Sequence, residues 1–225
     1  MSGPTSPSSD RPAPARKRAV RSRQAEAVTT PPEAADATRA QLTPETWINA
    51  ATEVLVNEGI AHVRVDVLAK QLQVTRGSFY WHFRSREDLL RRVLQSWSEL
   101  STVHLTRRLE TARSDPREQL QDLISLPFRG RSAARAARIE LAIRAWARRD
   151  DMARRAVDEA DAARMGYSAQ VFSALGFNPV EARARAFLLY TYQVGCSLMA
   201  TQASAAQHAE RGRFVEQLLQ RPLGD

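Results

Sequence analysis

Residues 65–90 read VDVLAKQLQVTRGSFYWHFRSREDLL, and this stretch decides the fold that we predict for the chain. Apolar residues recur at helical spacing over residues 65–72, which favours a short helix there. A second short helix is expected from Thr75 to Phe83, because Phe79 and Phe83 are four residues apart and therefore share an inward face. Two short helices joined by a tight turn form a helix-turn-helix unit when an earlier helix supports them.

Both the supporting helix and a longer following helix are marked in the sequence. The run Thr43-Pro44-Glu45 supplies a capping residue, a proline at the first helical position and an acid in the first turn, and Gly59 ends that helix. The run Ser85-Arg86-Glu87-Asp88 is close to a capping box and starts the long helix. We expect its inward apolar face to consist of Leu89, Leu90, Val93, Leu94, Trp97 and Leu100.

Helical signals continue to the end of the chain. Asp115 and Asn178 each precede a proline and an acid, as at the start of a helix, and residues 131–176 are rich in Ala and Arg, which favour helices. The final two helices are expected at residues 179–203 and 206–220. No alternating strand pattern bounded by turn residues is present. The sequence therefore predicts an all-α protein, with an N-terminal three-helix helix-turn-helix domain and a C-terminal helical domain.

Composition divides the chain into three predicted segments: a tail at residues 1–41, a helix-turn-helix domain at 42–90 and a helical domain at 91–225. The tail holds six of the 11 prolines and no aromatic residue, so it buries too little apolar surface to offset its ordering entropy, and we expect it to be disordered.

The net charge of +8 is unevenly distributed along the chain, with +5 in residues 1–25, −2 in 26–41, +1 in 42–98 and +4 in 99–225. The basic start of the tail suits loose phosphate binding, although a tail that only solubilises the chain is equally compatible with this pattern. The helix-turn-helix segment is nearly neutral. The placement of individual charges, and not bulk charge, must therefore set its affinity for a polyanion.

The remaining residue patterns exclude several classes of site. A single cysteine, Cys196, rules out a disulfide framework and a multi-cysteine metal centre, and we expect it to be an inert, buried thiol. The four histidines lie far apart in sequence without a carboxylate pattern around them, so no metal site is predicted. No catalytic constellation, cofactor motif, secretory signal or membrane-spanning run is recognised, and we expect an intracellular protein that does not enter the membrane.

Side chains of the second short helix suit contact with the major groove of DNA, which admits an α-helix. With Phe79 and Phe83 inward, the donors on Thr75, Arg76, Ser78, Tyr80 and His82 can point outward. An arginine there can make a bidentate contact to guanine, and the other groups suit phosphates or thymine methyls.

At these residues the chain resembles the TetR family of bacterial transcriptional regulators, and the resemblance runs from Thr43 to about Trp97. It implies a dimeric, cytoplasmic, nucleoid-associated regulator that binds double-stranded DNA at a palindromic operator, with a C-terminal domain for dimerisation and ligand binding. By motif position, Arg76, Ser78 and Tyr80 are expected at or next to bases, and Thr75, His82 and Arg86 at phosphates. The full set of DNA-binding candidates is Arg64, Thr75, Arg76, Gly77, Ser78, Tyr80, Trp81, His82 and Arg86, with Thr46 as a weaker candidate. For Trp81, packing between the DNA-binding helices and the long helix is the expected main role.

Two positions depart from the family pattern. Gln73 stands in the turn where glycine is usual, and a left-handed conformation there costs about 1 kcal/mol. Arg64 replaces the usual threonine at the start of residues 65–72, which loses a capping hydroxyl and gains a long cation that can reach a phosphate.

A ligand site is harder to place from sequence. The candidates are the aromatic and amide residues of the expected C-terminal helices: Phe128, Trp146, Tyr167, Phe172, Tyr190 and Gln193. They favour an apolar or aromatic effector with few polar groups, although core packing explains each of them as well. The main hypothesis is a repressor released from its operator by such a ligand. The alternatives are a DNA-binding dimer that responds to a protein partner or to no ligand, and a helical enzyme.

Overall fold

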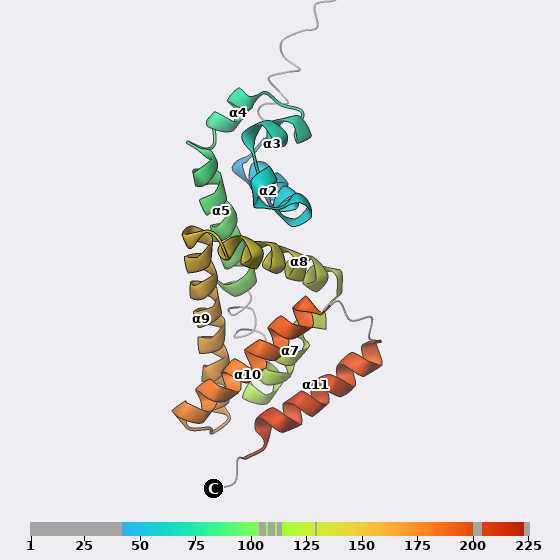
Figure 1. Ribbon diagram of the computed structural model, residues 1–225. Helices are drawn as coiled ribbons and strands as arrows, with labels where there is room; N and C mark the ends of the chain where they lie inside the picture. Colours follow the sequence, from blue (N-terminus) through green and yellow to red (C-terminus); the bar gives the residue numbers. More distant parts are fainter. Residues whose placement is uncertain are drawn as a thin grey trace, which may run out of the picture.

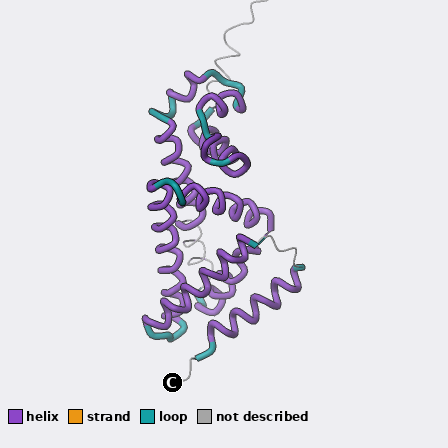
Figure 2. Tube along the Cα trace, viewed as in Figure 1, coloured by secondary structure: helices purple, strands orange, loops and turns teal. Residues whose placement is uncertain are grey.

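The computed structural model of the protein describes residues 42–103, 107, 111, 114–128, 130–199 and 204–222. These residues form helices and connecting loops, and the described part of the chain contains no strand (Figure 2). The all-α prediction is confirmed. The elements in chain order are α2 (Pro44–Glu58), η1 (Ile60–His62), α3 (Val65–Gln71), α4 (Arg76–Tyr80), α5 (Arg86–Ser98), η2 (Glu99–Val103), α7 (Pro116–Ser125), η3 (Leu126–Phe128), α8 (Gly130–Ala147), α9 (Asp151–Ala174), α10 (Pro179–Leu198) and α11 (Ala205–Gln220). The predicted disorder of residues 1–41 lies outside the described residues.

The molecule is elongated, with α2, α3 and α4 at one end and α11 near the other (Figure 1). The helix α5 leads away from the first end, and α8 crosses the molecule next to α2. The long helices α9 and α10 pack along each other, while α11 lies against α7.

Helix boundaries follow the capping residues read from the sequence. The Ser85 hydroxyl accepts a hydrogen bond from the amide of Asp88, and the carboxylate of Asp115 accepts one from the amide of Arg117. The side chain of Asn178 accepts from the amides of Val180 and Glu181, as expected for a cap that satisfies the free amides of the first turn.

One hydrophobic core joins the helix-turn-helix end of the molecule, formed by α2, α3 and α4, to the C-terminal helices. It contains Trp47, Leu68 and Phe79 together with the apolar face of α5, and it continues into Ile143 and Trp146 of α8 and the first half of α9. The helix α5 thus crosses the predicted domain boundary at residues 90 and 91, which stays a prediction. A second core lies among α7, the end of α9, α10 and α11.

The structure corrects the prediction that Leu100 faces inward. The α-helix α5 ends at Ser98, and the next five residues form a π-helical turn. Hydrogen bonds in such a turn span five residues instead of four, so the side chains that follow rotate away from the preceding face. Leu100 is consequently 65% exposed, whereas Leu89, Leu90, Val93, Leu94 and Trp97 are buried as predicted.

Candidate nucleic-acid interface

The turn between α3 and α4 is closed by backbone hydrogen bonds typical of a Schellman motif. The amide of Val74 donates to the carbonyl of Ala69 at 2.9 Å, and the amide of Gln73 donates to that of Lys70 at 3.2 Å. This motif requires a left-handed residue after the helix, and Gln73 has a φ of 57°. Gln73 thus adopts the left-handed conformation whose cost was considered from the sequence.

The short helix α4 is anchored by its aromatic face. Phe79 is fully buried, with its ring 5.4 Å from that of Trp47 in an edge-to-face arrangement and 5.3 Å from that of Phe83 in a stacked one. The helix ends at Tyr80, so Phe83 reaches the core from the following turn and not from the helix as predicted. This packing fixes the helix axis on α2, which holds the opposite face of α4 toward solvent.

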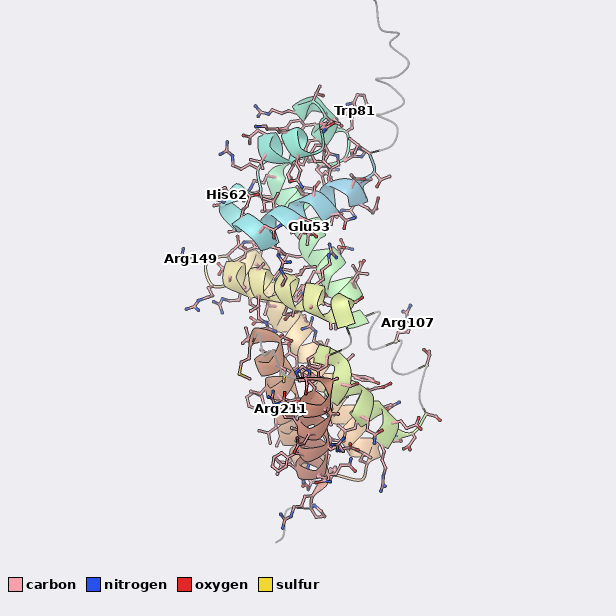
Figure 3. All side chains as sticks on the ribbon, turned by 90° about the vertical axis from the view of Figure 1, so that its right-hand side faces the viewer. Glu53, His62, Trp81, Arg107, Arg149 and Arg211 are labelled. Carbon is pink, nitrogen blue, oxygen red and sulfur yellow. The ribbon has the colours of Figure 1, made fainter. Side chains whose placement is uncertain are left out.

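Trp81 does not pack in the core, and the prediction of that role is wrong. Its side chain is 87% exposed and projects from the DNA-binding end of the molecule (Figure 3). Trp81 lies two residues from both Phe79 and Phe83, which corresponds to about 200° around a helical turn. With those two rings buried, the indole must point outward, next to Tyr80, which is 58% exposed.

The start of α4 presents exposed polar groups. Thr75 occupies the N-cap position, but its side chain makes no capping hydrogen bond, so the helix leaves its hydroxyl uncommitted. Arg76 and Gly77 are also exposed, and the Arg76 guanidinium makes no hydrogen bond or ion pair with any other described residue. A free guanidinium at this position can form a bidentate pair with a base or a phosphate.

Three other candidates are less open than predicted. Ser78 is only 8% exposed. Arg64 is exposed but pairs with Asp66 at 2.8 Å. The Arg86 guanidinium donates to the carbonyl oxygens of Val63 and Ile60, at 2.5 Å and 2.8 Å, and so holds the η1 turn against the start of α5. The structure thus gives Arg86 an internal role beside the expected phosphate contact, which stays a prediction.

His82 lies half-buried beside the first turn of α2. A hydrogen bond from the Thr43 side chain is the main cause that lowers the pKa of the Glu45 carboxyl, and the nearby charges of Arg92 and His82 lower it further. The weaker candidate Thr46 is in the same turn, with its Oγ1 3.4 Å from that of Thr43. The structure therefore brings His82 and Thr46 to the N-terminus of α2, next to the exposed face of α4.

A large cavity of about 1060 Å³ lies next to the helix-turn-helix unit, between α5, α8, α9 and α10. Its apolar wall includes Val93, Trp97 and Leu100, and Asn49 and Thr52 of α2 also border it. The DNA-binding unit thus contributes directly to the wall of this cavity. A volume of this size, with mostly apolar walls and a few polar groups, is typical of small-molecule sites.

The polar groups of the cavity form a charge-balanced network. Arg144 donates two hydrogen bonds to the carboxylate of Asp161, at 2.6 and 3.0 Å, and one to Glu140 at 2.9 Å. Arg164 also binds Glu140, at 3.1 Å, and its guanidinium lies 5.3 Å from the ring centre of Trp97. Sequence reasoning missed this network, because only Glu140 and Arg144 stand four residues apart on one helix, whereas the other ion pairs join residues 17 and 24 positions apart.

The hydroxyl of Tyr190 joins both arginines to Asp161. It accepts hydrogen bonds from Arg144 and Arg164 and donates one to the Asp161 carboxylate. Burial raises the pKa of Tyr190 to about 12, and the adjacent Asp161 adds to this effect. Burial alone would lower the pKa of Arg144, but its bonds to Asp161 and the charge of Glu140 raise it above the ordinary value.

The predicted ligand residues are not all brought together. Tyr190 and Gln193 line the large cavity, and the Gln193 amide donates to the carbonyl of Leu123 at 2.8 Å. Trp146 lines a different groove, and Phe128 packs on His208 with ring centres 4.1 Å apart. The remaining two, Tyr167 and Phe172, are buried in the second core.

The structure also bears on the other chemistry considered from sequence. The thiol of Cys196 is partly buried, and this burial raises its pKa, although a hydrogen bond with Tyr192 and the charge of Arg211 act in the opposite direction. Within the described ranges, no group of three or more His, Cys, Asp or Glu side chains is arranged to hold a metal ion. Among the helices that the structure describes, none combines the length and apolar content needed to cross a membrane.

Comparisons with known proteins point to the segment that contains α3 and α4. Residues 48–93 match the family model described as bacterial regulatory proteins of the tetR family. The HTH-type transcriptional regulator SrpR of Pseudomonas putida is 40% identical over 60 residues, which cover 27% of this chain and 28% of that protein. The match therefore spans less than a third of that relative's own length.

Solved structures share the fold over most of the chain. A transcriptional regulator from Rhodococcus sp. Rha1 superposes with a TM-score of 0.63 at 20% identity, covering 80% of this chain and 94% of the other. The multidrug binding protein EbrR, solved with imidazole, gives a TM-score of 0.55 at 20% identity, covering 81% and 96%. The matched family and relatives are transcriptional regulators and not enzymes. Taken with the helix-turn-helix geometry of α3 and α4, these matches support a transcriptional regulator of the TetR type, and the sequence similarity to that family lies in residues 48–93.

Proposed function

We propose that the protein is a homodimeric, cytoplasmic, nucleoid-associated transcriptional repressor that leaves a palindromic operator when a small molecule binds it. The observation that carries the proposal is the division of α4 into two faces. Phe79 is fully buried on α2, while Tyr80 and Trp81 are exposed together with the unpaired Arg76. A short helix held rigidly by one face and presenting donors on the other is suited to the major groove.

Each exposed group of this unit has a role in the proposed complex. Arg76 reads a guanine through two hydrogen bonds, and Tyr80 contacts a base methyl or a phosphate. Thr75 donates a hydrogen bond from its uncommitted hydroxyl to a phosphate, and His82 donates one from a ring N–H in the turn after α4. Because residues 42–98 carry a net charge of only +1, these few placed contacts supply most of the specific affinity.

Exposed apolar side chains on α10 and α11 support dimerisation through these two helices. On α10, Val180, Phe187 and Leu198 recur at spacings that place them on one face, and they are 71%, 60% and 52% exposed. On α11, Phe214 and Leu218 are four residues apart and are 66% and 56% exposed. Large apolar side chains gathered in this way are typical of a protein interface, and a second copy of the chain would cover them.

The large cavity supports control by a small molecule. Its apolar wall suits an apolar or aromatic effector, and Tyr190 and Gln193 supply polar groups at its edge. Since α2 also borders the cavity, an effector that fits it better in one orientation of the DNA-binding unit shifts the dimer toward that orientation. Release follows when this orientation changes the spacing of the two recognition helices from the roughly 34–36 Å that one turn of B-DNA requires.

Selection from random DNA tests the proposal without knowledge of the target genes. The purified full-length protein is incubated with a randomised duplex pool, and bound sequences are enriched over several rounds at physiological salt. We expect an inverted repeat whose half-sites lie one or more helical turns apart. Enrichment of no sequence, or of a single half-site bound by a monomer in sedimentation measurements, would contradict the proposal.

Ligand control is tested separately by thermal-shift screening of apolar and aromatic compounds. A compound that binds the folded state raises the melting temperature. At a concentration of a hundred times its Kd, it adds about 2.7 kcal/mol to the free energy of unfolding. The same compound must weaken binding to the selected operator. A protein that binds the operator but responds to no compound would favour the alternative of a dimer controlled by a protein partner or by no ligand.

A further inference from the structure

A second groove, of about 850 Å³, lies at the junction between the DNA-binding unit and the C-terminal helices. One wall comes from the end of α2 and the η1 turn, including Leu55 and Ile60. The other comes from the second half of α8 and the turn into α9, including Leu141 and Trp146. It is distinct from the large cavity, with which it shares only Leu141 among the lining residues.

The floor of this groove is apolar. Leu55 and Trp146 are buried beneath it at 2% and 4% exposure, and Ile60, Leu141 and Ala142 are half-buried along its length. Ala145 stands exposed on the α8 wall. An open apolar strip of this kind favours a ligand with a hydrocarbon or aromatic body, because burying that body releases water from both surfaces.

The mouth of the groove carries positive charge that the protein does not neutralise. Arg148 and Arg149 are exposed there, and neither guanidinium makes an ion pair or hydrogen bond with any other described residue. Figure 3 shows Arg149 reaching outward from the end of α8, on the same side of the molecule as His62 of η1. Arg138, also at the groove, donates to the neutral Asn57 amide oxygen at 2.8 Å.

Asp150, the acidic residue that lines the groove, is hydrogen-bonded to the start of α9. The Asp150 carboxylate caps α9 by accepting a hydrogen bond from the amide of Ala153 at 2.9 Å. This setting differs from the large cavity, where Arg144 and Arg164 are matched by Glu140 and Asp161. The large cavity is thus electrically balanced without a ligand, whereas the groove is not.

We propose that this interdomain groove is a second ligand site, which binds an amphipathic anion: an apolar body against Leu55, Ile60 and Trp146, with an acidic head group between Arg148 and Arg149. Because the two walls belong to the DNA-binding unit and to the C-terminal helices, a ligand seated between them holds the present angle between α2 and α8. The site therefore acts on the orientation of the recognition helix independently of the large cavity.

Octanoate is a suitable probe, with octan-1-ol as the neutral compound of the same chain length. Isothermal titration of the full-length dimer is expected to show saturable octanoate binding that is tighter than octanol binding. The double variant Arg148→Ala/Arg149→Ala should weaken octanoate binding about tenfold, since each exposed charge contact contributes modestly. The matched control Arg154→Ala/Arg155→Ala removes two exposed arginines of α9 that do not line the groove, and it should leave the affinity unchanged.

Two steric variants separate the groove from the large cavity. Ala145→Trp fills the groove from an exposed helix position and should abolish octanoate binding, whereas Leu100→Trp narrows the large cavity and should not change it. The inference is overturned if Ala145→Trp binds octanoate as the natural chain does, if Leu100→Trp alone loses it, or if octanol binds equally well. Absence of octanoate binding at millimolar concentration overturns it as well. None of these outcomes depends on operator binding, so they do not decide the proposed repressor function.

Discussion

The buried arginines of the C-terminal helices and Arg76 of the helix-turn-helix unit are held in opposite ways. In the C-terminal helices, Arg144, Arg164 and Arg185 are largely buried and each meets a carboxylate. Arg185 is 4% exposed, lies 4.0 Å from the ring centre of Phe177 and also donates to the carbonyls of Leu219 and Arg221, which ties the end of α11 to α10. In the DNA-binding unit, Arg76 is exposed and without a partner among the described residues.

This difference teaches that partner and burial, and not net charge, decide what a cation does here. The buried arginines are fully engaged in ion pairs within the fold, since an unpaired charge in the interior costs too much free energy. The exposed ones keep their capacity for phosphates or anionic ligands. The predictions below test this division, from the largest expected effect to the smallest.

Among the arginines, the largest effect is expected from Arg164→Met. The change removes two hydrogen bonds to Glu140 and leaves that carboxylate with Arg144 as its charged partner. Breaking a buried pair in this way should lower the free energy of unfolding by about 3 kcal/mol, measured by urea denaturation. The double variant Arg164→Met/Glu140→Leu should recover part of the loss, because it leaves no uncompensated acid. If Arg164→Met were as stable as the natural chain, the ion pair of Arg164 with Glu140 would contribute nothing to stability.

Arg76→Ala should weaken operator binding and leave the stability of the fold almost unchanged. The free energy of unfolding is expected to change by less than about 0.5 kcal/mol, because the side chain is exposed and unpaired. Binding to the selected operator should weaken by about 1–3 kcal/mol, with relaxed preference at one base pair, measured by fluorescence anisotropy on single-base variants. Uniform weakening on every sequence would instead make Arg76 a phosphate contact.

Local features of this fold could be predicted from the sequence, and the long-range ones could not. The starts of α7 and α10 follow from a capping residue with a proline after it, because a cap satisfies amides only two or three residues away. The start of α2 is marked by Pro44 at its first position, although the Thr43 side chain makes no capping hydrogen bond. The left-handed Gln73 is also a local feature, since it stands in the turn position where glycine is usual. These signals are complete within a few residues of sequence.

The candidate sites depend on residues that the chain brings together from far apart. Arg86 binds carbonyls 23 and 26 residues away, and the Glu140 network joins α5, α8, α9 and α10. The prediction that Leu100 faces inward is wrong because a π-helical turn rotates its side chain outward, and no residue type in the sequence predicts such a turn. The exposure of Trp81, by contrast, was available from helix geometry once Phe79 and Phe83 were placed inward.

A smaller effect is expected at Gln73. The same Schellman motif ends α9, where the left-handed position is Gly176 with a φ of 98°. Gln73→Gly should therefore raise the free energy of unfolding by about 1 kcal/mol, because it removes the steric penalty of a left-handed side chain. The control Gln71→Gly, at an exposed helical position of α3, should lower it by roughly 0.5–1 kcal/mol. Equal destabilisation by both changes would mean that the Gln73 side chain makes compensating contacts.

The smallest effect on stability is expected at Trp81. Comparing Trp81→Ala with Trp47→Ala distinguishes the exposed indole from the buried one. Trp81→Ala should change the free energy of unfolding by less than about 0.5 kcal/mol, since the side chain is 87% exposed. Trp47→Ala should cost about 3–5 kcal/mol, because that indole is wholly buried against Phe79. Operator binding by the stable Trp81→Ala variant should nevertheless weaken, since the indole stands beside Tyr80 on the face that we propose contacts DNA. A loss of stability comparable to that of Trp47→Ala would return Trp81 to the core, and the surface proposed to read DNA would then lose its largest side chain.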